Sequence, residues 1–326
     1  MAINVAINGF GRIGRLVLRG IIESGRKDIN VVAINDLGTV DANAHMLQYD
    51  SIHGPLNAKV RTTKSGLNIG GRGIKVIAER DPANLPWAKM GVDIALECTG
   101  LFTDRDAAAK HIEAGAKRVL VSAPAGNTDL TVVYGVNDKK LRKSHKVVSN
   151  ASCTTNCLAP VAQVLNKTCG IARGYMTTVH AFTGDQRTVD TLHSDLRRAR
   201  AASLSMIPTS TGAAKAVGLV LPELAGKLDG TAVRVPTPNV SMIDLVFEAR
   251  IKTTVEAING AISKAAAGPL KGVLGVCDQP MVSIDFNHNP HSSTFDLTQT
   301  QIVGGKLVRV LSWYDNEWGF ANRMSD

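Results

Sequence analysis

The residue best suited to covalent chemistry in this sequence is Cys153. It lies in the polar run 149–156, just before an apolar helical pattern that includes Leu158, Val161 and Leu165. A thiol at a helix start meets unpaired backbone N–H groups and the positive end of the helix dipole, and both favour the thiolate. The alternative is a buried cysteine that acts as a small apolar filler. The hydroxyl and amide side chains around Cys153 favour a nucleophile.

A nucleophilic thiol needs a base, and His180 is the candidate. Residues 174–180 form a β-rich run that delivers this histidine to a strand end. A cysteine and a histidine distant in sequence can meet in the fold and form a thiolate and imidazolium pair. The chain contains eight histidines, and a histidine at a strand end is often structural. The pairing of Cys153 with His180 is therefore a hypothesis at this point.

The N-terminus carries a glycine pattern in a specific context. A short apolar strand at 3–7 is followed by Gly9, Gly11 and Gly14, and these open an amphipathic helix. A second β-branched strand at 29–34 then leads to an acidic residue. Strand, glycine turn, helix, strand and acid together form the dinucleotide-binding fingerprint, in which the glycines allow a tight turn, close approach to pyrophosphate and close helix packing.

Asp36 is the acid of this fingerprint. A carboxylate at the end of the second strand accepts hydrogen bonds from the ribose hydroxyls of the adenosine and repels a 2′-phosphate, which favours NAD over NADP. The alternative is a turn cap, since Asp before Leu-Gly suits one. We weight the cofactor role higher.

Length and composition indicate a two-domain enzyme. The 326 residues exceed the usual limit of about 250–300 for one core, and 44% of them are hydrophobic. No apolar stretch is long enough to cross a bilayer and the chain begins directly with a strand, so we expect a cytoplasmic protein. Five scattered cysteines suit neither a disulfide framework nor a zinc site, and we expect no metal.

The net charge of +9 raises the question of nucleic acid. The densest basic clusters are 139–143, which reads as a solvated helix surface, and 197–200, which lies in a loop-like segment where cations would suit anionic substrates. Aromatic residues make up only 4% of the chain, which leaves few stacking platforms for single strands. Nucleic acid is therefore not expected as the primary partner.

The order of predicted elements changes near Cys153. Upstream, strands at 3–7, 29–34, 92–98, 118–122 and 131–135 alternate with helices such as 105–114, which predicts a doubly wound parallel sheet. Downstream, long β-rich runs at 231–234, 240–251, 281–286 and 306–312 occur with helices at 212–219 and 255–267. This part predicts an α+β domain with a mixed or antiparallel sheet and helices on one side.

The sequence resembles phosphorylating glyceraldehyde-3-phosphate dehydrogenase over nearly its whole length. The resemblance rests on six motifs, which are Ile-Asn-Gly-Phe-Gly-Arg-Ile-Gly-Arg at 7–15, Ala-Ser-Cys-Thr-Thr-Asn-Cys at 151–157, Met-Thr-Thr-Val-His at 176–180, Pro-Thr-Ser-Thr-Gly-Ala-Ala-Lys at 208–215, Arg-Val-Pro-Thr-Pro-Asn at 234–239 and Ser-Trp-Tyr-Asp-Asn-Glu-Trp-Gly at 312–319. It implies the glycolytic oxidation of glyceraldehyde 3-phosphate by NAD and inorganic phosphate to 1,3-bisphosphoglycerate, through a thiohemiacetal and a thioester on Cys153 with His180 as base.

The resemblance also implies binding residues. Thr183 and Arg234 would hold the phosphate of the substrate, and the attacking phosphate or the triose would contact Ser152, Thr154, Arg198, Thr211 and the Gly212 amide. Arginine forks, hydroxyls and backbone N–H groups are suitable phosphate donors. Each of these residues alone could instead cap a helix or a turn, as Thr211 and Gly212 would at a helix start.

On the cofactor side the family pattern maps onto Arg12 and Ile13 at the pyrophosphate turn, Asp36 at the ribose, and Arg80, Ser122 and Asn316 elsewhere along the bound NAD. Asn316 would bring the C-terminal segment back to the first domain. The expected organisation is therefore a Rossmann cofactor domain of residues 1–152 with 315–326, and a catalytic domain of residues 153–314. The family is usually a homotetramer.

Two other functions are compatible with parts of the sequence. Erythrose-4-phosphate dehydrogenase shares the glycine turn, cysteine and histidine, but generally lacks the Thr-Ser-Thr-Gly-Ala-Ala-Lys pattern and ends in hydrolysis. Retention of Thr211 and Gly212 favours phosphorolysis. A non-enzymatic surface or nucleic-acid-binding protein of dehydrogenase shape would be expected to lose its nucleophile or base, and here Cys153 and His180 are both present.

Overall fold

The structure of this chain is a computed structural model that describes residues 2–326. Contacts divide these residues into two compact units. The first contains residues up to 132, 140–151 and 321–326, and the second contains 133–139 and 152–320. Each unit has its own sheet. Within 2–326, none of the helices has the length and apolar character that a membrane span requires.

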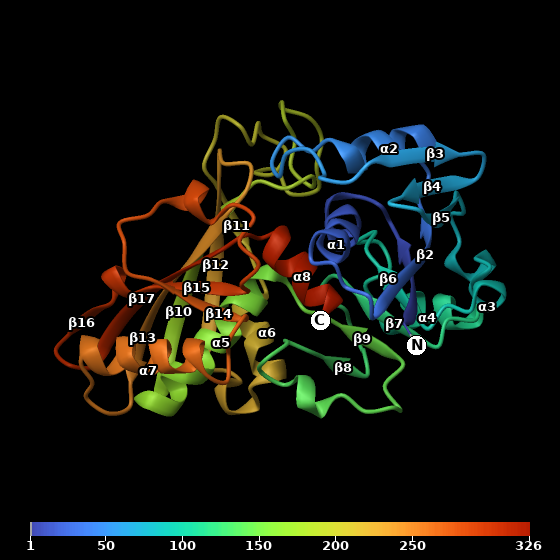
Figure 1. The fold of residues 1–326 in the computed structure, drawn as a ribbon. Coiled ribbons are helices and arrows are strands. Elements are labelled where there is room, and N and C mark those ends of the chain that lie inside the picture. The colour runs from blue at the N-terminus through green and yellow to red at the C-terminus, as the bar shows by residue number, and fades with distance from the viewer. Residues whose placement is uncertain (1) are drawn as a thin grey trace. The chain divides into compact units, whose positions relative to one another are not determined.

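The first unit contains a nine-stranded sheet in the order β3-β4-β5-β2-β1-β6-β7-β9-β8. Every neighbouring pair from β5 to β8 is parallel, while β3, β4 and β5 pair antiparallel at one edge, beside α2 (Figure 1). Its elements are β1 Ile3–Asn8, α1 Arg12–Glu23, β2 Ile29–Asn35, α2 Val40–Gln48, β3 Val60–Thr63, β4 Gly66–Ile69, β5 Arg72–Ile77, η1 Pro82–Asn84, α3 Trp87–Met90, β6 Ile94–Glu97, α4 Arg105–Glu113, β7 Arg118–Val121, β8 Leu130–Thr131 and β9 Val147–Ser149.

The strand order places the glycine turn at a topological switch point. The chain moves outward from β1 to β2 in one direction and from β6 to β7 in the other. Because strand–helix–strand crossovers are right-handed, α1 and α4 cover opposite faces of the sheet. The carboxyl ends of β1 and β6 therefore meet where the order reverses, which is the usual ligand crevice of such sheets.

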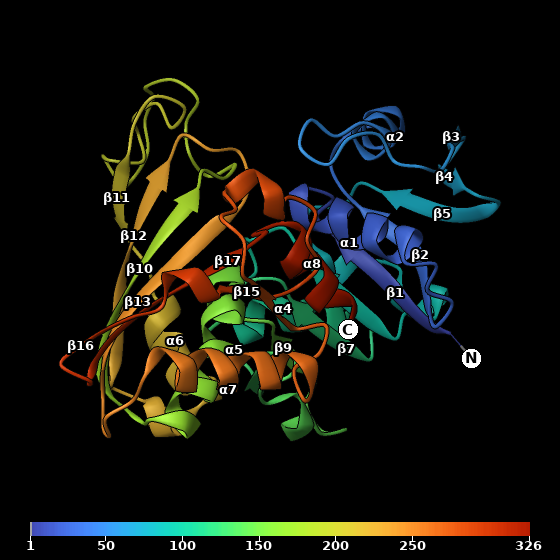
Figure 2. The same ribbon diagram turned by 60° about the vertical axis from the view of Figure 1, so that its left-hand side comes forward.

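The second unit contains a mixed eight-stranded sheet in the order β11-β12-β10-β13-β17-β15-β14, with β16 paired to β17. The pairs β10–β12 and β14–β15 are parallel and the others antiparallel. Helices α5, α6 and α7 lie together on one side of this sheet (Figures 1 and 2). The elements are α5 Cys153–Thr168, β10 Ile171–Ala181, β11 Ile207–Ser210, α6 Ala213–Val220, η3 Pro222–Leu224, β12 Leu228–Val235, β13 Ser241–Ala249, α7 Val255–Ala267, β14 Leu274–Cys277, η4 Ser283–Phe286, β15 Ser293–Asp296, η5 Leu297–Gln299, β16 Gln301–Val303 and β17 Leu307–Tyr314.

Two short elements fall where the two units divide. Helix η2 (Asp138–Lys140) contains the change at 139/140, and the last helix, α8 (Trp318–Ser325), contains the change at 320/321. The terminal residues belong to the first unit, in which Arg26 pairs with Asp326 at 2.9 Å.

Alternation along β10 brings His180 to the helix-covered face of its sheet. Met176, Thr178 and His180 are all buried at every second position, whereas Tyr175 on the opposite face is 51% exposed. Side chains alternate between the two faces of a strand, so a histidine two residues beyond a buried threonine must share its side. The packing of α5 against this face thus determines which groups His180 can meet.

The predicted fold class is confirmed, and three local predictions are corrected. The run 281–286 is not a strand, because Asp285 accepts the Val282 N–H at 2.8 Å and closes the single turn η4. Of 131–135 only Thr131 belongs to a strand, since the side chains of Asn137 and Asp138 hold the following backbone in turns. The cluster 139–143 is exposed, but only the short turn η2 is helical.

Gly14 provides a test of the strand–helix packing at the glycine turn. A Cβ at this position would lie 2.1 Å from the Gly9 carbonyl oxygen, whereas a Cβ at Gly11 would meet nothing within 4 Å. We expect Gly14→Ala to lower the free energy of unfolding by about 1–3 kcal/mol through overpacking. Gly11→Ala, at φ −72°, should leave it nearly unchanged. Urea unfolding of both variants measures the difference, and equal midpoints would contradict this packing role.

Candidate active site

Cys153 is the first residue of α5, as the sequence predicted. The side chain of Ser152 caps the helix by accepting the Thr155 N–H at 3.0 Å. The preceding residue, Ala151, has φ +56°, a left-handed conformation that is uncommon for a residue with a Cβ. Such strained turns occur at functional sites, where the surrounding structure maintains them. Here the turn places a thiol at the positive end of a 16-residue helix.

The structure brings Cys153 and His180 together. The Cys153 Sγ lies 3.6 Å from the His180 Nε2, a distance suited to a hydrogen bond that involves sulfur. His180 stands near the end of β10 and is 4% exposed. Its ring makes an edge contact with Tyr314, with centroids 5.8 Å apart. The nucleophile and base geometry inferred from sequence is therefore present within one unit.

The other ring nitrogen of His180 has two close neighbours. Nδ1 lies 2.7 Å from the Ala181 carbonyl oxygen and 2.8 Å from Arg234 NH1, which also donates to that carbonyl at 2.9 Å. A carbonyl only accepts and a guanidinium only donates, so the two contacts suit different tautomers, and both orient the ring with Nε2 toward the sulfur. Arg234 is the register neighbour of His180 on the parallel strand β12.

Burial shifts the pKa values of this pair in a direction that the sequence did not indicate. Burial raises the pKa of the Cys153 thiol, against the opposing effects of the Arg234 charge and of hydrogen bonds from Thr154. Burial and then Arg234 lower the pKa of His180 to about 3. The expectation of a ready thiolate considered only the helix start. In the ligand-free protein burial favours a neutral thiol and a neutral imidazole instead.

The remaining cysteines do not share the geometry of Cys153. Burial raises the pKa of Cys98 and of Cys157 to about 12, which makes both poor nucleophiles. Cys157 packs one helical turn beyond Cys153, fully buried, with its sulfur 3.2 Å from the Ser293 Oγ. The sequence-based assignment of Cys157 to packing therefore agrees with its surroundings.

A chain of hydroxyl groups beneath Cys153 was not anticipated from sequence. Thr154 Oγ1 and Thr178 Oγ1 lie 2.8 Å and 2.9 Å from the Tyr314 hydroxyl, and Thr178 donates to the Met242 carbonyl at 3.0 Å. All three hydroxyl-bearing side chains are buried. They join α5, β10 and β17, three elements far apart in sequence. Tyr314 lies two residues beyond the strand predicted at 306–312, and continuation of that strand with a period of two was the available signal.

Arg234 has a feature that favours anion binding. Its Nε is buried and has no hydrogen-bond partner among the described residues. Burial lowers the pKa of this arginine, and the charges of Arg198 and Asp185 also act on it, so the two arginines of the predicted phosphate set lie within electrostatic range of one another. A buried guanidinium donor without an acceptor is costly unless a ligand completes it.

Arg198 is compensated by carboxylates in this structure. Its NH1 donates to Asp185 Oδ2 at 2.8 Å, and Asp195 lies 3.7 Å from its Nε, which also donates to Thr209 at 3.0 Å. Neither aspartate was considered in the sequence interpretation. The signal available in the sequence was that both aspartates come shortly before the basic run 197–200.

The other predicted phosphate ligands lie in turns of the same unit. Thr183 forms a turn with Gln186, whose backbone N–H donates to the Thr183 carbonyl at 2.9 Å. Thr211 caps α6 by accepting the Ala213 N–H at 3.2 Å, and Gly212 is the N-cap residue. The capping alternative for Thr211 is thus realised. Its hydroxyl can still donate to a ligand.

A pocket in the first unit collects several predicted cofactor residues. It lies at the switch point and is lined by Asn8, Gly9, Gly11, Asn35, Asp36, Leu37, Glu79, Arg80, Cys98, Thr99, Leu101 and Phe102. Gly9 has φ +87°, and a Cβ there would strike the Thr99 backbone at 2.7 Å. Open space above Gly11 leaves room for a ligand to approach the backbone. These features fit a dinucleotide.

Asp36 is both a turn former and a pocket residue. Its Oδ1 accepts the Gly38 N–H at 2.8 Å, and its Oδ2 accepts the Phe10 N–H at 2.9 Å. The turn-cap alternative is therefore correct as a description of one contact. Each carboxylate oxygen has two lone pairs, so acceptor capacity for ribose hydroxyls remains.

Some predicted cofactor residues do not line this pocket. Arg12 pairs with Asp50, and hydrogen bonds from Arg12 and from two backbone N–H groups outweigh burial and lower the pKa of Asp50 to about 2. Ile13 and Gly14 lie in the first turn of α1, and Ser122 directly follows β7. Asn316 lies in the second unit, where its Oδ1 accepts from Ser241 at 2.8 Å, and Ser241 in turn accepts the Ala181 N–H.

Comparison with known proteins agrees with this geometry. The family model described as "Glyceraldehyde 3-phosphate dehydrogenase, NAD binding domain" matches residues 3–105, and that described as "Glyceraldehyde 3-phosphate dehydrogenase, C-terminal domain" matches residues 152–316. Proteins named glyceraldehyde-3-phosphate dehydrogenase from Xanthobacter flavus, Cereibacter sphaeroides and Geobacillus stearothermophilus are 69%, 65% and 58% identical, each over 100% of this chain and 97% of the relative. The chain belongs to the glyceraldehyde-3-phosphate dehydrogenase family.

Proposed function

We propose that this protein oxidises glyceraldehyde 3-phosphate with NAD and inorganic phosphate, and that Cys153 and His180 carry out the chemistry. The observation that carries the proposal is the 3.6 Å contact between Sγ and Nε2 at the start of a helix, near Arg234, whose buried Nε has no hydrogen-bond partner among the described residues. The close relatives named above support the same reaction.

The first step is attack of Sγ on the aldehyde carbon. The sulfur forms a C–S bond, its proton passes to Nε2 of His180, and Nε2 then delivers that proton to the carbonyl oxygen to give the thiohemiacetal hydroxyl. Arg234 lowers the energetic cost of negative charge on the sulfur, which burial otherwise raises. The Nδ1 contact with Ala181 holds the ring with Nε2 toward the sulfur.

The thiohemiacetal is then oxidised to a thioester. His180 accepts the hydroxyl proton while the carbon loses a hydride, and NAD, when bound, supplies the hydride acceptor. Inorganic phosphate next attacks the thioester carbon and the C–S bond breaks. The products are 1,3-bisphosphoglycerate and the restored Cys153. Formation of the thioester conserves the energy of oxidation in the acyl phosphate.

Two anions must be bound near one sulfur in this sequence of steps. We assign Thr183 and Arg234 to the phosphate of the substrate, and Ser152, Thr154, Arg198, Thr211 and the Gly212 amide to the attacking phosphate or the triose. An anion at Arg198 competes with Asp185 for the same guanidinium, so the site is not left with uncompensated positive charge between turnovers.

For the cofactor, we assign the pocket at the switch point to NAD. Gly9, Gly11, Arg12, Ile13 and Gly14 would form the pyrophosphate turn, with Asp36, Arg80, Ser122 and Asn316 as further ligands. The carboxylate of Asp36 favours an unphosphorylated ribose. The NAD-binding family model covers the glycine turn, Asp36 and Arg80.

The reaction is tested by NADH formation from two aldehydes with and without phosphate. We expect glyceraldehyde 3-phosphate to be the better substrate and the rate to depend on inorganic phosphate. Erythrose-4-phosphate dehydrogenase, which the comparisons do not favour, predicts the reverse on both counts. Faster turnover of erythrose 4-phosphate that is indifferent to phosphate would refute the proposed reaction.

Variants of the two catalytic residues should separate nucleophile from base. Cys153→Ser should reduce turnover to below about one ten-thousandth of wild type, because a hydroxyl has no accessible ionised form here. His180→Asn should leave slow activity, reduced about 10²–10⁴-fold, through loss of the proton acceptor. Alkylation of Cys153 by iodoacetamide at pH 7 should also slow in His180→Asn. An alkylation rate equal to wild type would rule out the pairing.

We further propose that the chain forms a homotetramer in the cytoplasm. The two compact units would correspond to a cofactor domain (1–152 with 315–326) and a catalytic domain (153–314). No membrane partner is expected, and nucleic acid is not expected as the primary partner.

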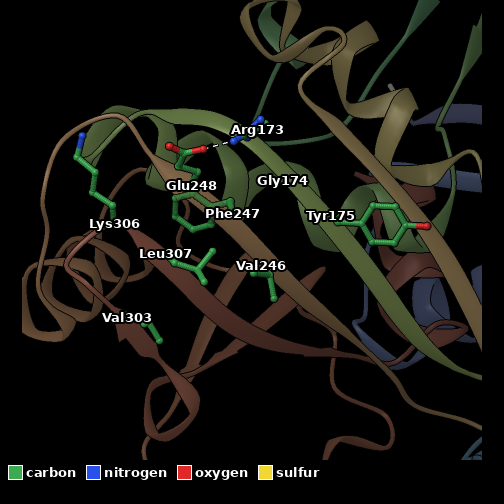
Figure 3. Close-up of a pocket in the computed structure, with 9 residues that line it drawn as sticks. All are labelled: Arg173, Gly174, Tyr175, Val246, Phe247, Glu248, Val303, Lys306 and Leu307. Carbon is green, nitrogen blue, oxygen red and sulfur yellow. Dashed lines mark hydrogen bonds and ion pairs between the residues drawn. The ribbon is translucent and has the colours of Figure 1, made fainter.

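The face of the second sheet opposite its helices supports self-association. A groove on this face is lined by Arg173, Gly174, Tyr175, Val246, Phe247, Glu248, Val303, Lys306 and Leu307 (Figure 3). Tyr175 and Val246 are cross-strand neighbours, and both are exposed although they are large and apolar. In the loop after β10, Leu192, Leu196 and Leu204 are 79–90% exposed. Apolar surfaces of this kind are usual at protein interfaces.

A charge at the centre of this face tests the assembly. Val246→Asp should convert the tetramer into smaller species, because an unpaired carboxylate would be buried in the interface. Ala257→Asp is the matched control, since it adds the same charge to the exposed first turn of α7 on the other side of the sheet. Light scattering coupled to gel filtration gives the masses. A tetrameric Val246→Asp protein would show that this face is not the interface.

A further inference from the structure

A buried carboxylate lies beneath the pocket of the first unit. Glu97 ends β6 and is 1% exposed. Its Oε1 accepts the backbone N–H of Thr99 at 2.8 Å and also the Thr99 hydroxyl, and its Oε2 accepts Asn8 Nδ2 at 2.6 Å and His111 Nε2 at 3.0 Å. An ionised carboxylate only accepts and offers two lone pairs on each oxygen. Four donors therefore use its whole capacity.

The ring of His111 is fixed as one of those donors. The indole N–H of Trp87 lies 2.9 Å from His111 Nδ1. An indole nitrogen only donates, so Nδ1 must accept, and the ring proton of the neutral imidazole lies on Nε2 and faces Glu97. Trp87 and His111 are both fully buried. Helices α3 and α4 thus hold the carboxylate from below.

The same network continues across the neighbouring strands. Asn8 Oδ1 accepts Asn35 Nδ2 at 2.7 Å, and Asn35 exchanges two hydrogen bonds with the backbone of Glu79, at 2.8 Å and 2.9 Å. Asn8, Asn35 and Glu97 end the strands β1, β2 and β6, and Glu79 follows β5. One continuous set of hydrogen bonds therefore links four strand exits, and Asn8, Asn35, Glu79 and Thr99 all line the pocket.

The backbone of the glycine turn and the backbone that follows β6 are packed with little space between them. Gly9 and the Thr99 backbone are so close that a Cβ on Gly9 would lie 2.7 Å from the Thr99 nitrogen. Glu97 is hydrogen-bonded to both sides of this contact, because it accepts from Asn8, which precedes Gly9, and from Thr99, which follows the end of β6. Loss of the carboxylate would leave buried donors without acceptors. The glycine turn and the exit of β6 would then no longer be held to one another.

We propose that Glu97 is a positioning residue for the dinucleotide, which ties the glycine turn to the exit of β6 and so preorganises the pocket before NAD binds. This inference rests on the proposed assignment of the pocket to NAD. A pocket held in its binding shape loses less conformational entropy when the ligand binds, so the network contributes to affinity without contact with the ligand.

The test is NAD affinity of the full-length Glu97→Gln protein, measured by titration calorimetry without substrate. An amide has only one oxygen, so its NH2 group must face either Asn8 and His111 or the Thr99 backbone N–H, and at least one buried donor loses its acceptor. We expect the Kd for NAD to rise about tenfold or more. The rate of Cys153 alkylation in the absence of NAD should stay at the wild-type value, because the second unit is untouched.

Two control variants separate positioning from stability. Asp93→Asn removes a charge at the other end of β6, where Asp93 accepts from the Asn4 backbone and from Lys117. It should change the Kd by less than about twofold. Val147→Ala removes buried methyl groups from the same unit, in an apolar cluster that includes none of the four donors of Glu97. It should lower the melting temperature while the Kd changes by less than about threefold.

Asp36→Ala distinguishes failure of this inference from failure of the pocket assignment. If Asp36→Ala weakens NAD binding and folded Glu97→Gln does not, the pocket assignment stands and the positioning role is wrong. If neither variant alters the Kd, the pocket assignment fails as well. A loss of NAD affinity that is proportional to the fall in melting temperature across Glu97→Gln and Val147→Ala would reduce Glu97 to a structural residue. Should Glu97→Gln be insoluble, Glu97→Asp, which keeps the charge but shortens its reach, must weaken NAD binding for the inference to hold.

Discussion

The proposed chemistry depends on how one helix start is held against one strand end. Helix α5 buries Leu158, Val161 and Leu165 completely against the second sheet, and each such side chain contributes about 1.5–3 kcal/mol. Apolar packing alone would allow small shifts of α5 along the sheet. Polar contacts remove this freedom, because Thr154 and Thr178 share the Tyr314 hydroxyl and Cys157 lies against Ser293. The distance between Sγ and Nε2 is therefore set by buried hydrogen bonds that connect α5 with the strands β10, β15 and β17.

Both units use the same device, in which strand ends converge and a helix begins beside them. In the first unit the glycine turn leads from the end of β1 to the start of α1, and Gly9 and Gly14 allow the close approach that this requires. In the second unit the turn from Ala151 to Cys153 does the same for a thiol. The two sites differ in what supports them. A carboxylate with four donors lies below the first, and neutral hydroxyl groups lie below the second.

Sequence patterns predicted the fold class and the start of α5, because each depends on local chemistry or on a period of two or 3.6 residues. The pairing of Cys153 with His180 was a hypothesis, and the structure places the two side chains 3.6 Å apart. Sequence patterns could not predict the Glu97 network. Asn8, Glu97, His111 and Trp87 are far apart in the chain, and a glutamate at a strand end looks like an ordinary solvated residue until its neighbours are known. The run 281–286 misled for a related reason. Its alternation suits a strand, but Val282 and Ile284 are 60–70% exposed and a single aspartate closes a turn.

The protonation state of Cys153 differs from the one that its position at a helix start would predict by itself. The helix start and the charge of Arg234 both favour the thiolate. Burial opposes them and is the larger effect on the thiol, while it also disfavours the imidazolium. A site of this kind holds sulfur and nitrogen close together with little resting charge. In the proposed mechanism, negative charge develops on the sulfur when the proton moves to Nε2, near the Arg234 guanidinium, whose Nε has no hydrogen-bond partner among the described residues. Preorganised cations that act on charge as it forms are the most effective form of electrostatic catalysis.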